Sequence, residues 1–267
     1  DWNEATIPPS PLVLKRIDEY LMGGTLNEYP DIHCGQLLSK LEEYTRLPKE
    51  QLAVYNGSDD ALDNIFGAFI DSSSSVAAFD PGYSQVDSFI KKRTTAYTKL
   101  PIEDPFGEHT YPLDELGDYD VVYLINPHSP TGHFFPTVEV ERLLRLHPQT
   151  LFIVDEAYFE YAKQTCSHLT GKYTNLIVTR TFSKAFSLAS CRLGYVISCK
   201  ENIEVLAKIR NGKSVNSFAQ IAGCAALDDV EYMSKYVEEV ERAKTFLYSQ
   251  LIDMETLTAI PSFTNFI

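Results

Sequence analysis

The stretch TRTFSKAFSLASCRLGY, from Thr179 to Tyr195, decides the fold, and a short apolar strand predicted at 176–178 leads into it. Lys184 and Arg192 lie eight residues apart in this stretch, among small hydroxyl side chains. A buried lysine loses its proton easily and attacks carbonyl carbons, whereas the planar fork of arginine fits phosphate oxygens. Ser183 adds a hydroxyl for the same anion. A solvated turn of serine, lysine and arginine has the same composition, so other stretches must decide between these interpretations.

Two further apolar runs end in polar residues in the same way. Residues 121–125 and 151–154 are continuous apolar segments, typical of parallel strands that are covered on both faces. Asn126 follows the first run and Asp155 follows the second. Strands alternate with helical segments at this spacing, which predicts right-handed crossovers and an α/β sheet. Because ligands bind at the carboxyl ends of strands in such sheets, we expect Asn126, Asp155 and Lys184 to lie together.

The remaining segments complete this pattern. Residues 1–11 are polar and rich in proline, which predicts an extended arm. Strands are expected at 76–79, 95–100, 195–198, 257–260 and 263–267, and helices at 12–21, around 37–44, and at 84–92, 137–145, 203–209, 218–227 and 230–251. The run Asn56-Gly57-Ser58-Asp59 predicts a glycine turn and a hydroxyl N-cap, followed by an amphipathic helix. The free N–H groups of such a helix start form an anion site, although a plainly capped helix has the same signature.

We therefore divide the chain into three parts. Residues 1–25 are expected to form an N-terminal arm and first helix, and residues 26–228 a large domain. Residues 229–267 are expected to form a linking helix and the start of a small C-terminal domain, which is incomplete in this sequence.

Composition excludes several classes of partner. The chain has 267 residues, of which 44% are hydrophobic and 22% charged, which is typical of a globular protein. A formal net charge of -14 argues against nucleic acid and anionic membranes as partners. No apolar run approaches the roughly 20 residues that span a bilayer. The five cysteines lack a C-x-x-C pair, which indicates reduced thiols in a cytoplasmic protein. The histidines lack ligand spacing, so we expect no metal site.

Polar side chains at the predicted strand ends match the needs of one cofactor. Aspartate at position 155 would keep a pyridine nitrogen protonated, which turns the ring into an electron sink. Asn126 and Tyr158 would bind a phenolic oxygen on that ring, and Tyr83 would stack on its face. Each of these residues has a common structural role of its own. Together with Lys184 and Arg192, they describe pyridoxal phosphate chemistry.

At this point the chain resembles a known family, the fold-type I pyridoxal-phosphate enzymes of aminotransferase class I/II. Within that family it is most similar to the histidinol-phosphate aminotransferases. The motifs that carry the resemblance occur in the family's order and span most of the chain. They are Tyr29-Pro30-Asp31, Asn56-Gly57-Ser58-Asp59, Asn126-Pro127 with Pro130-Thr131-Gly132, Asp155-Glu156-Ala157-Tyr158, and Ser183-Lys184 with Arg192-Leu193-Gly194.

The resemblance implies a fold and a set of roles. The fold would be a mainly parallel sheet between helices, the large domain of fold type I, with a partial or missing small C-terminal domain. Lys184 would hold the cofactor, pyridoxal 5'-phosphate, and then move the substrate proton. The roles implied for the other residues are a pyridine nitrogen partner at Asp155, ring-oxygen contacts at Asn126 and Tyr158, stacking at Tyr83, and phosphate binding at Ser58, Asp59, Ser183 and Arg192. Tyr29 would reach the phosphate of a neighbouring subunit, which implies a homodimer.

The expected activity is transfer of an amino group from an amino acid or an amino-alcohol, such as histidinol phosphate, to a 2-oxo acid such as 2-oxoglutarate. Two alternatives stay open at this stage. One is decarboxylation of a phosphorylated hydroxy-amino acid, and the other is a truncated homologue without catalysis.

Three departures from the family's pattern limit how far its roles carry over to this chain, and the third is the argument for the homologue without catalysis. The family's opening motif, Asn-Glu-Asn-Pro-Tyr, is replaced here by Asn3-Glu4-Ala5-Thr6-Ile7. Before Pro130-Thr131-Gly132, where the family usually has two asparagines, this chain has His128 and Ser129. The arginine that binds the substrate carboxylate in relatives would fall beyond Ile267. His128 itself is expected to be a surface residue.

Overall fold

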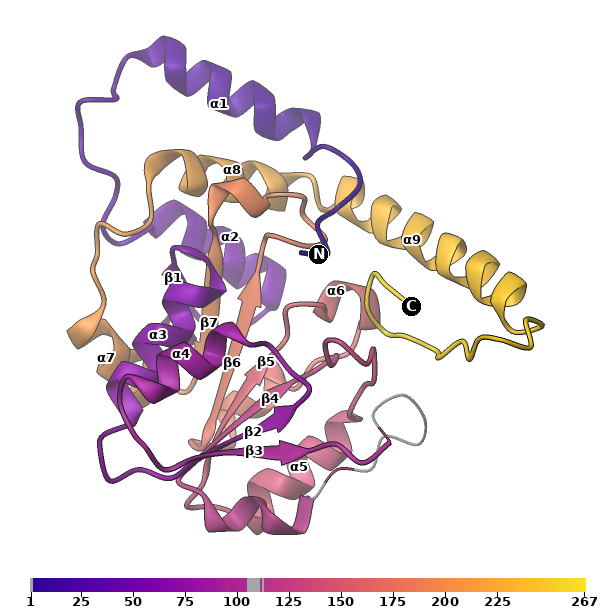
Figure 1. Ribbon diagram of the computed structural model, residues 1–267. Helices are drawn as coiled ribbons and strands as arrows, with labels where there is room; N and C mark the ends of the chain where they lie inside the picture. Colours follow the sequence, from indigo (N-terminus) through magenta and orange to yellow (C-terminus); the bar gives the residue numbers. More distant parts are fainter. Residues whose placement is uncertain (1, 105–110, 112) are drawn as a thin grey trace.

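A mixed, mainly parallel β-sheet forms the centre of the molecule (Figure 1). The computed structural model describes residues 2–104, 111 and 113–267. Within these residues the strands are β1 (Leu52–Tyr55), β2 (Val76–Asp80), β3 (Tyr97–Pro101), β4 (Val121–Ile125), β5 (Leu151–Asp155), β6 (Leu176–Thr181) and β7 (Gly194–Ser198). They form a seven-stranded sheet in the order β1-β7-β6-β5-β4-β2-β3. Strand β7 is antiparallel to both of its neighbours, and the other pairs are parallel.

Helices lie on both faces of the sheet. The described helices are α1 (Pro11–Gly23), α2 (Gly35–Thr45), α3 (Gly57–Phe69), α4 (Gln85–Lys91), α5 (Thr137–Leu146), α6 (Phe159–Ala162), α7 (Lys200–Ile209), α8 (Ser217–Asp228) and α9 (Val230–Leu251). Short 3-10 turns occur at Lys49–Gln51, Leu113–Asp118, Ser167–Gly171 and Ala189–Cys191. None of the helices among the described residues has both the length and the hydrophobicity that a membrane span requires.

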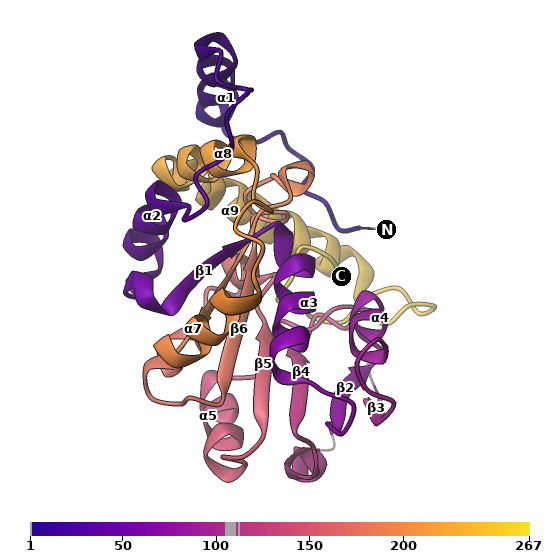
Figure 2. The ribbon, with the colours of Figure 1, turned by 90° about the vertical axis from the view of Figure 1, so that its left-hand side faces the viewer.

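Two apolar clusters, one on each face, hold these layers together. Side chains of α3, α4 and α7 pack with Tyr123 and Ile125 of β4 on one face. Side chains of α2, α5, α8 and α9 belong to the other cluster, which includes Val122 and Leu124. Successive residues of a strand point to opposite faces, so one apolar strand supplies both clusters. Figure 2 shows α3, α4 and α7 together on one side of the strands. The predicted α/β sheet between helices is therefore confirmed.

The sheet brings distant parts of the chain to one edge. Strands β4, β5 and β6 run in parallel, so the residues after Ile125, Val154 and Thr181 meet at the same end. Antiparallel pairing of β1 with β7 places Tyr55 opposite Gly194. The start of α3 consequently lies beside the loop that carries Lys184.

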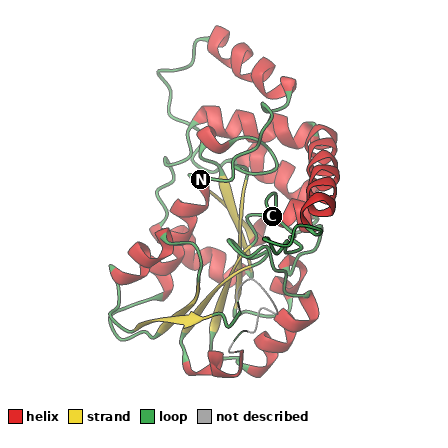
Figure 3. Cartoon of the chain, turned by 45° about the vertical axis from the view of Figure 1, so that its right-hand side comes forward, coloured by secondary structure: helices red, strands yellow, loops and turns green. Residues whose placement is uncertain are grey.

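Some sequence-based expectations were wrong. Segments 257–260 and 263–267 are not strands; Figure 3 draws the chain after α9 as loop. Their backbone pairs with another loop instead of a strand, since Phe263 N donates to Gly132 O at 2.8 Å. Strand β1 was not expected at all. Residue 1 of the expected N-terminal arm lies outside the described residues.

Two local predictions also need correction. The helix that begins at Gly57 has Asn56 as N-cap, without a capping side-chain hydrogen bond. Asp60 accepts from the Asn56 backbone N–H instead, at 3.0 Å. His128 is not a surface residue: it is 0% exposed, because its ring packs against Tyr111 and its Nδ1 lies 2.9 Å from Thr131 Oγ1.

Candidate active site

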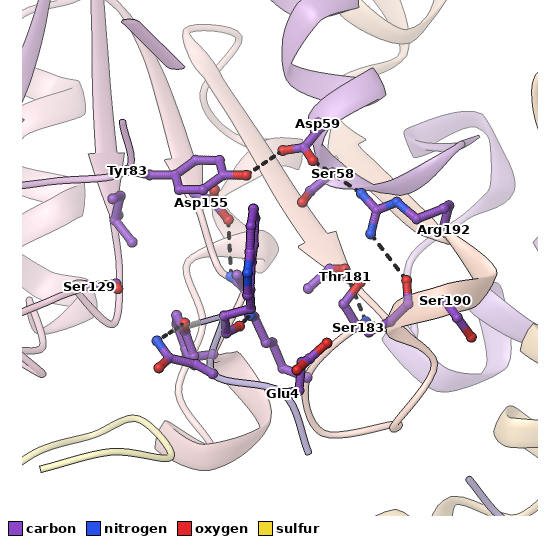
Figure 4. A pocket seen from close by; sticks show the side chains of 17 residues that line it. Glu4, Ser58, Asp59, Tyr83, Ser129, Asp155, Thr181, Ser183, Ser190 and Arg192 are labelled. Carbon is purple, nitrogen blue, oxygen red and sulfur yellow. Dashed lines mark hydrogen bonds and ion pairs between the residues drawn. The ribbon is translucent and has the colours of Figure 1, made fainter. Parts of the chain in front are cut away.

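A pocket of about 570 Å³ opens at the carboxyl ends of the parallel strands (Figure 4). That volume is within the usual range for small-molecule sites. Its lining consists of Trp2, Asn3, Glu4, Ser58, Asp59, Tyr83, Ile125, Ser129, Asp155, Ala157, Tyr158, Thr181, Ser183, Lys184, Ala189, Ser190 and Arg192. Eight of the ten residues singled out from the sequence are in this set. Asn126 and Tyr29 are the two that are not.

Lys184 lies in the loop after β6, inside the pocket. Burial lowers the pKa of its amine, while the nearby carboxylates of Asp155 and Glu4 act in the opposite direction. Its Nζ donates to the backbone oxygen of Trp2 at 2.5 Å and lies 5.6 Å from the ring centroid of Tyr158. A lowered pKa increases the fraction of neutral amine, which is the nucleophilic form.

Asp155 is the last residue of β5 and is only 5% exposed. Burial raises the pKa of its carboxyl to about 6. Donors from the protein act against that effect, since Ala157 N–H donates to Oδ1 at 3.1 Å and Tyr123 O–H donates to Oδ2 at 2.7 Å. The side chain therefore presents a buried and oriented carboxylate to the pocket.

Donors for an anion gather at the opposite side of the pocket. Ser58 lies in the first turn of α3, where backbone N–H groups are free of helical partners. Ser183 lines the same region, and its backbone N–H donates to Thr181 Oγ1 at 3.1 Å. Arg192 brings a guanidinium whose Nη2 lies 3.1 Å from Asp59 Oδ2.

Two glycines make this close approach possible. Gly57 has a φ of +86°, and an added Cβ would lie 2.7 Å from Arg192 Nη2. An added Cβ at Gly194 would lie 2.6 Å from the Ser58 backbone nitrogen. Any side chain at these positions would push the helix start or the arginine out of place. The serine, arginine and helix start therefore form a cradle that fits a phosphate group.

Tyr83 and Asp59 connect the two sides of the site. The Tyr83 hydroxyl donates to Asp59 Oδ1 at 2.8 Å, and Asp59 binds Arg192 through its other oxygen. Figure 4 shows the three side chains in one row. Burial, followed by the hydrogen bond to Asp59, raises the pKa of Tyr83. The Asp59 carboxylate thus orients the arginine, and the two charges partly neutralise each other.

The three remaining predicted site residues are Asn126, Tyr158 and Tyr29, and only Tyr158 lines the pocket. Asn126 is buried, and its side chain donates to Phe135 O at 3.0 Å and accepts from Phe135 N at 2.9 Å. A carboxamide has a second N–H, so contact between Asn126 and a ring oxygen stays a prediction. Tyr158 lines the pocket and accepts from Asn3 Nδ2 at 3.0 Å. Tyr29 is 79% exposed and lies away from this chain's own pocket.

Some residues of the lining were not among the predicted site residues. The N-terminal segment 2–4 reaches into the pocket, and Asn265 Nδ2 holds it by donating to Asn3 O at 3.1 Å. Ser129, Thr181 and Ser190 add hydroxyl groups. The Asn3-Glu4 pair and Ser129 gave a signal, since they lie in motifs of the family, but Thr181 and Ser190 had none of their own.

The residues present fit pyridoxal phosphate. The pocket offers an amine of lowered pKa, a buried carboxylate, an aromatic face and a cradle for phosphate, which are the groups that this cofactor needs. No group of three or more metal-ligating side chains occurs among the described residues. The lysine, the buried aspartate and the phosphate cradle match an organic cofactor with an anionic tail.

Comparisons with known proteins identify the family of this chain. The family model for aminotransferase class I and II matches residues 2–267. A dihydroxyacetone phosphate transaminase of Campylobacter jejuni is 40% identical over 91% of this chain and 68% of its own length. A histidinol-phosphate aminotransferase of Geotalea daltonii is 32% identical over 99% of this chain and 75% of its own length.

Comparison with a solved structure supports the same family. The histidinol-phosphate aminotransferase of Sinorhizobium meliloti in complex with pyridoxal-5'-phosphate superposes with a TM-score of 0.89. It is 26% identical, and the match covers 98% of this chain and 72% of that one. This chain therefore belongs to the class I and II aminotransferases, and is a fold-type I transaminase that uses pyridoxal 5'-phosphate with an amino donor and a 2-oxo acid.

Proposed function

We propose that the enzyme exchanges an amino group between a small phosphorylated amino-alcohol and a 2-oxo acid such as 2-oxoglutarate. The observation that carries the catalytic part is the presence of Lys184, Asp155 and Arg192 around one pocket. The names of the relatives support the substrate class, because they give dihydroxyacetone phosphate and histidinol phosphate. In the reverse direction, glutamate would donate its amino group to the matching phosphorylated ketone.

The residues would divide the work as follows. When bound, pyridoxal phosphate supplies a carbonyl for the amine and a ring that accepts electrons. Lys184 Nζ would take the proton from the substrate carbon that bears nitrogen, and later release it. Asp155 would hold the ring nitrogen, and Tyr83 would cover one face of the ring. Ser58, Ser183 and Arg192 would hold the cofactor phosphate, with Asp59 orienting the arginine. Asn126 and Tyr158 would face the ring oxygen.

Absorbance spectroscopy tests this proposal. Purified protein is loaded with pyridoxal phosphate and mixed separately with glutamate, histidinol phosphate, serinol phosphate and phosphothreonine. We expect the visible band of the bound cofactor to bleach with at least one phosphorylated amino-alcohol and to return with 2-oxoglutarate. The Lys184→Ala variant should lack that band, whereas Lys235→Ala, which changes an exposed lysine paired with Glu231, should keep it.

Other results would contradict the proposal. Release of carbon dioxide from phosphothreonine, without bleaching that a 2-oxo acid reverses, would indicate the decarboxylase. Failure of every donor with a fully loaded protein would indicate a homologue without catalysis. An unchanged band in Lys184→Ala would remove that lysine from cofactor attachment.

We also propose that the enzyme is a homodimer in which Tyr29 completes the neighbouring site. Tyr29 is well exposed, and Lys213 Nζ lies 4.2 Å from its ring centroid. Other exposed apolar side chains precede it in the sequence, namely Leu14, Leu21, Met22 and Leu26. Exposed apolar side chains, where they gather, are typical of a contact surface.

Mixing two inactive variants tests the shared site. Lys184→Ala and Tyr29→Ala are unfolded and refolded together, which produces mixed dimers. Each mixed dimer would contain one site with both native residues, so activity should return to about a quarter of the wild-type value. No recovery, in a mixture shown by native mass spectrometry to contain mixed dimers, would contradict the proposal.

A further inference from the structure

The Asp155 carboxylate is held by a tyrosine that lies outside the pocket. Tyr123 lies on β4, and its hydroxyl donates to Asp155 Oδ2 at 2.7 Å. Both residues are buried, with 2% and 5% of their surface exposed. Tyr123 pairs with Ile153 on the parallel strand β5, and alternate residues of a strand share a face. Asp155 is two residues beyond Ile153, so Tyr123 and Asp155 point to the same side of the sheet, two register pairs apart.

Neighbouring groups hold both partners of the Tyr123–Asp155 hydrogen bond in place. The Tyr123 ring packs edge-on against Phe66 of α3, with 6.3 Å between the centroids. Ala157 N–H donates to the other carboxylate oxygen at 3.1 Å. Each oxygen of Asp155 therefore accepts at least one hydrogen bond, and the Thr179 side chain also favours the anion. Tyr123 does not line the pocket, so it would act on a ligand through Asp155 and not by direct contact.

The ionisation state of the Asp155 carboxyl depends on its neighbours, because the group is buried away from water. Burial favours the neutral acid, and a neutral acid has no negative charge to balance a pyridinium ring. The titratable groups around Asp155 are Tyr123 of β4, Asp59 of α3, Tyr83 after β2, Tyr158 after β5 and Lys184 after β6. Asp59 also disfavours the anion. A hydroxyl that donates to the carboxylate stabilises the charged form against both effects.

We propose that Tyr123 is a positioning residue that keeps the Asp155 carboxylate ionised. The proton between Asp155 and the pyridine nitrogen of the cofactor then stays on the nitrogen. This inference rests on the placement of that nitrogen against Asp155 proposed above. The same tyrosine would also fix the direction of the carboxylate in the pocket.

Nitrogen-15 NMR of the holoenzyme, loaded with ring-labelled pyridoxal phosphate, tests the inference. The nitrogen signal distinguishes a protonated from an unprotonated ring. In Tyr123→Phe the ring keeps its packing against Phe66 but loses the donor, so the signal should move towards the unprotonated form. The dissociation constant of the cofactor should rise about tenfold, as expected for one hydrogen bond to a charged group.

A matched control distinguishes loss of the hydrogen bond to Asp155 from loss of any buried tyrosine hydroxyl. Tyr55 of β1 belongs to the same apolar cluster and is 0% exposed, and its hydroxyl has no hydrogen-bond partner among the described residues. Tyr55→Phe should leave the nitrogen signal and the cofactor affinity unchanged. A variant with 3-fluorotyrosine at position 123 keeps the side chain's size and donates more strongly. Its signal should move in the opposite direction from that of Tyr123→Phe, which a structural role does not explain.

The Asp155→Asn variant, alone and combined with Tyr123→Phe, separates this inference from the proposed function. If Asp155→Asn leaves the wild-type nitrogen signal unchanged, the nitrogen is not at Asp155, and both proposals fail. If Asp155→Asn moves the signal while Tyr123→Phe matches Tyr55→Phe, only the role of Tyr123 is overturned. The inference further requires that Tyr123→Phe adds no change to Asp155→Asn.

Discussion

At the residue scale, some side chains in and around the pocket can be predicted from the sequence, whereas others cannot. Lys184 and Asp155 each follow a buried apolar strand, so their positions at the sheet edge were predictable. Tyr123 gave no such signal, because a tyrosine inside the run VVYLI has the appearance of one more core residue. Its role depends on a cross-strand neighbour, and the register of β4 against β5 is not readable from either segment.

Arg192 provides a prediction at this scale. Its backbone has a φ of +51°, so asparagine, which tolerates that conformation, is the suitable replacement. Arg192→Asn removes the guanidinium that we propose binds the cofactor phosphate, and the dissociation constant of pyridoxal phosphate should rise about 10- to 100-fold. Affinity for pyridoxal, which lacks the phosphate, should stay the same. Fluorescence titration with both compounds measures the difference.

Arg46→Asn is the control for that variant. Arg46 has a φ of +59° and lies on the surface at the end of α2, so the same substitution meets the same backbone away from the pocket. An equal loss of affinity for both compounds in Arg192→Asn would contradict a role in phosphate binding.

At the element scale, the start of α3 is positioned by a pair of strands. Sequence patterns predicted α3 but not β1, which has only four residues, Leu52–Tyr55. A strand that short is recognisable only through its partner β7, far along the chain. The expected strands at 257–260 and 263–267 illustrate the same limit. Their apolar residues were visible, but no strand of the described residues pairs with them.

Gly194→Ala tests how tightly α3 and β7 fit together. The added methyl group would lie 2.6 Å from Ser58 N and 2.9 Å from Arg180 O, and neither backbone atom can move freely. We expect the free energy of unfolding to fall by about 1–3 kcal/mol, with weaker binding of pyridoxal phosphate. Chemical denaturation and cofactor titration measure both effects.

Gly171→Ala is the matched change for Gly194→Ala. A Cβ at position 171 would meet nothing closer than Gln51 Nε2 at 3.6 Å, which is ordinary contact. A Gly194→Ala protein as stable as Gly171→Ala would show that the helix start tolerates a shift.

At the scale of the whole molecule, a buried polar network lies behind the pocket. Arg180 binds Glu156 at 2.9 Å and stacks on Phe159, with 3.7 Å from the guanidinium carbon to the ring centroid. Glu160 shares this interior and accepts a long hydrogen bond of 3.4 Å from Tyr44. Burial raises the pKa of the Glu160 carboxyl to about 7, although Arg180 opposes the shift. Sequence composition gave no indication of these charges in the core.

Glu160 should therefore affect how stability depends on pH. Its folded-state pKa is above the unfolded value of about 4.3, so the folded protein binds more protons between the two values. Its contribution to stability falls as pH rises from about 4.5 to 7 and stays constant above that. In Glu160→Gln this decline should be absent, which makes the variant more stable than wild type by ~1–3 kcal/mol at pH 8.

Urea denaturation of the cofactor-free protein between pH 5 and pH 8 measures that difference. Asp155 titrates in the same direction in both proteins, so the comparison isolates Glu160. Parallel pH profiles for the two proteins would contradict a raised pKa at this residue.

The pairing of β1 with β7 also has a consequence for synthesis in the cell. The residues that it brings together, Asp59 and Arg192, are 133 positions apart, so the first half of the phosphate cradle leaves the ribosome long before the second. Until β7 emerges, β1 is an unpaired strand that can associate with other nascent chains. Vitamin B6, by bridging both halves once they meet, would act as a folding aid for newly made chains. Cells starved of the vitamin should then accumulate this protein in the insoluble fraction.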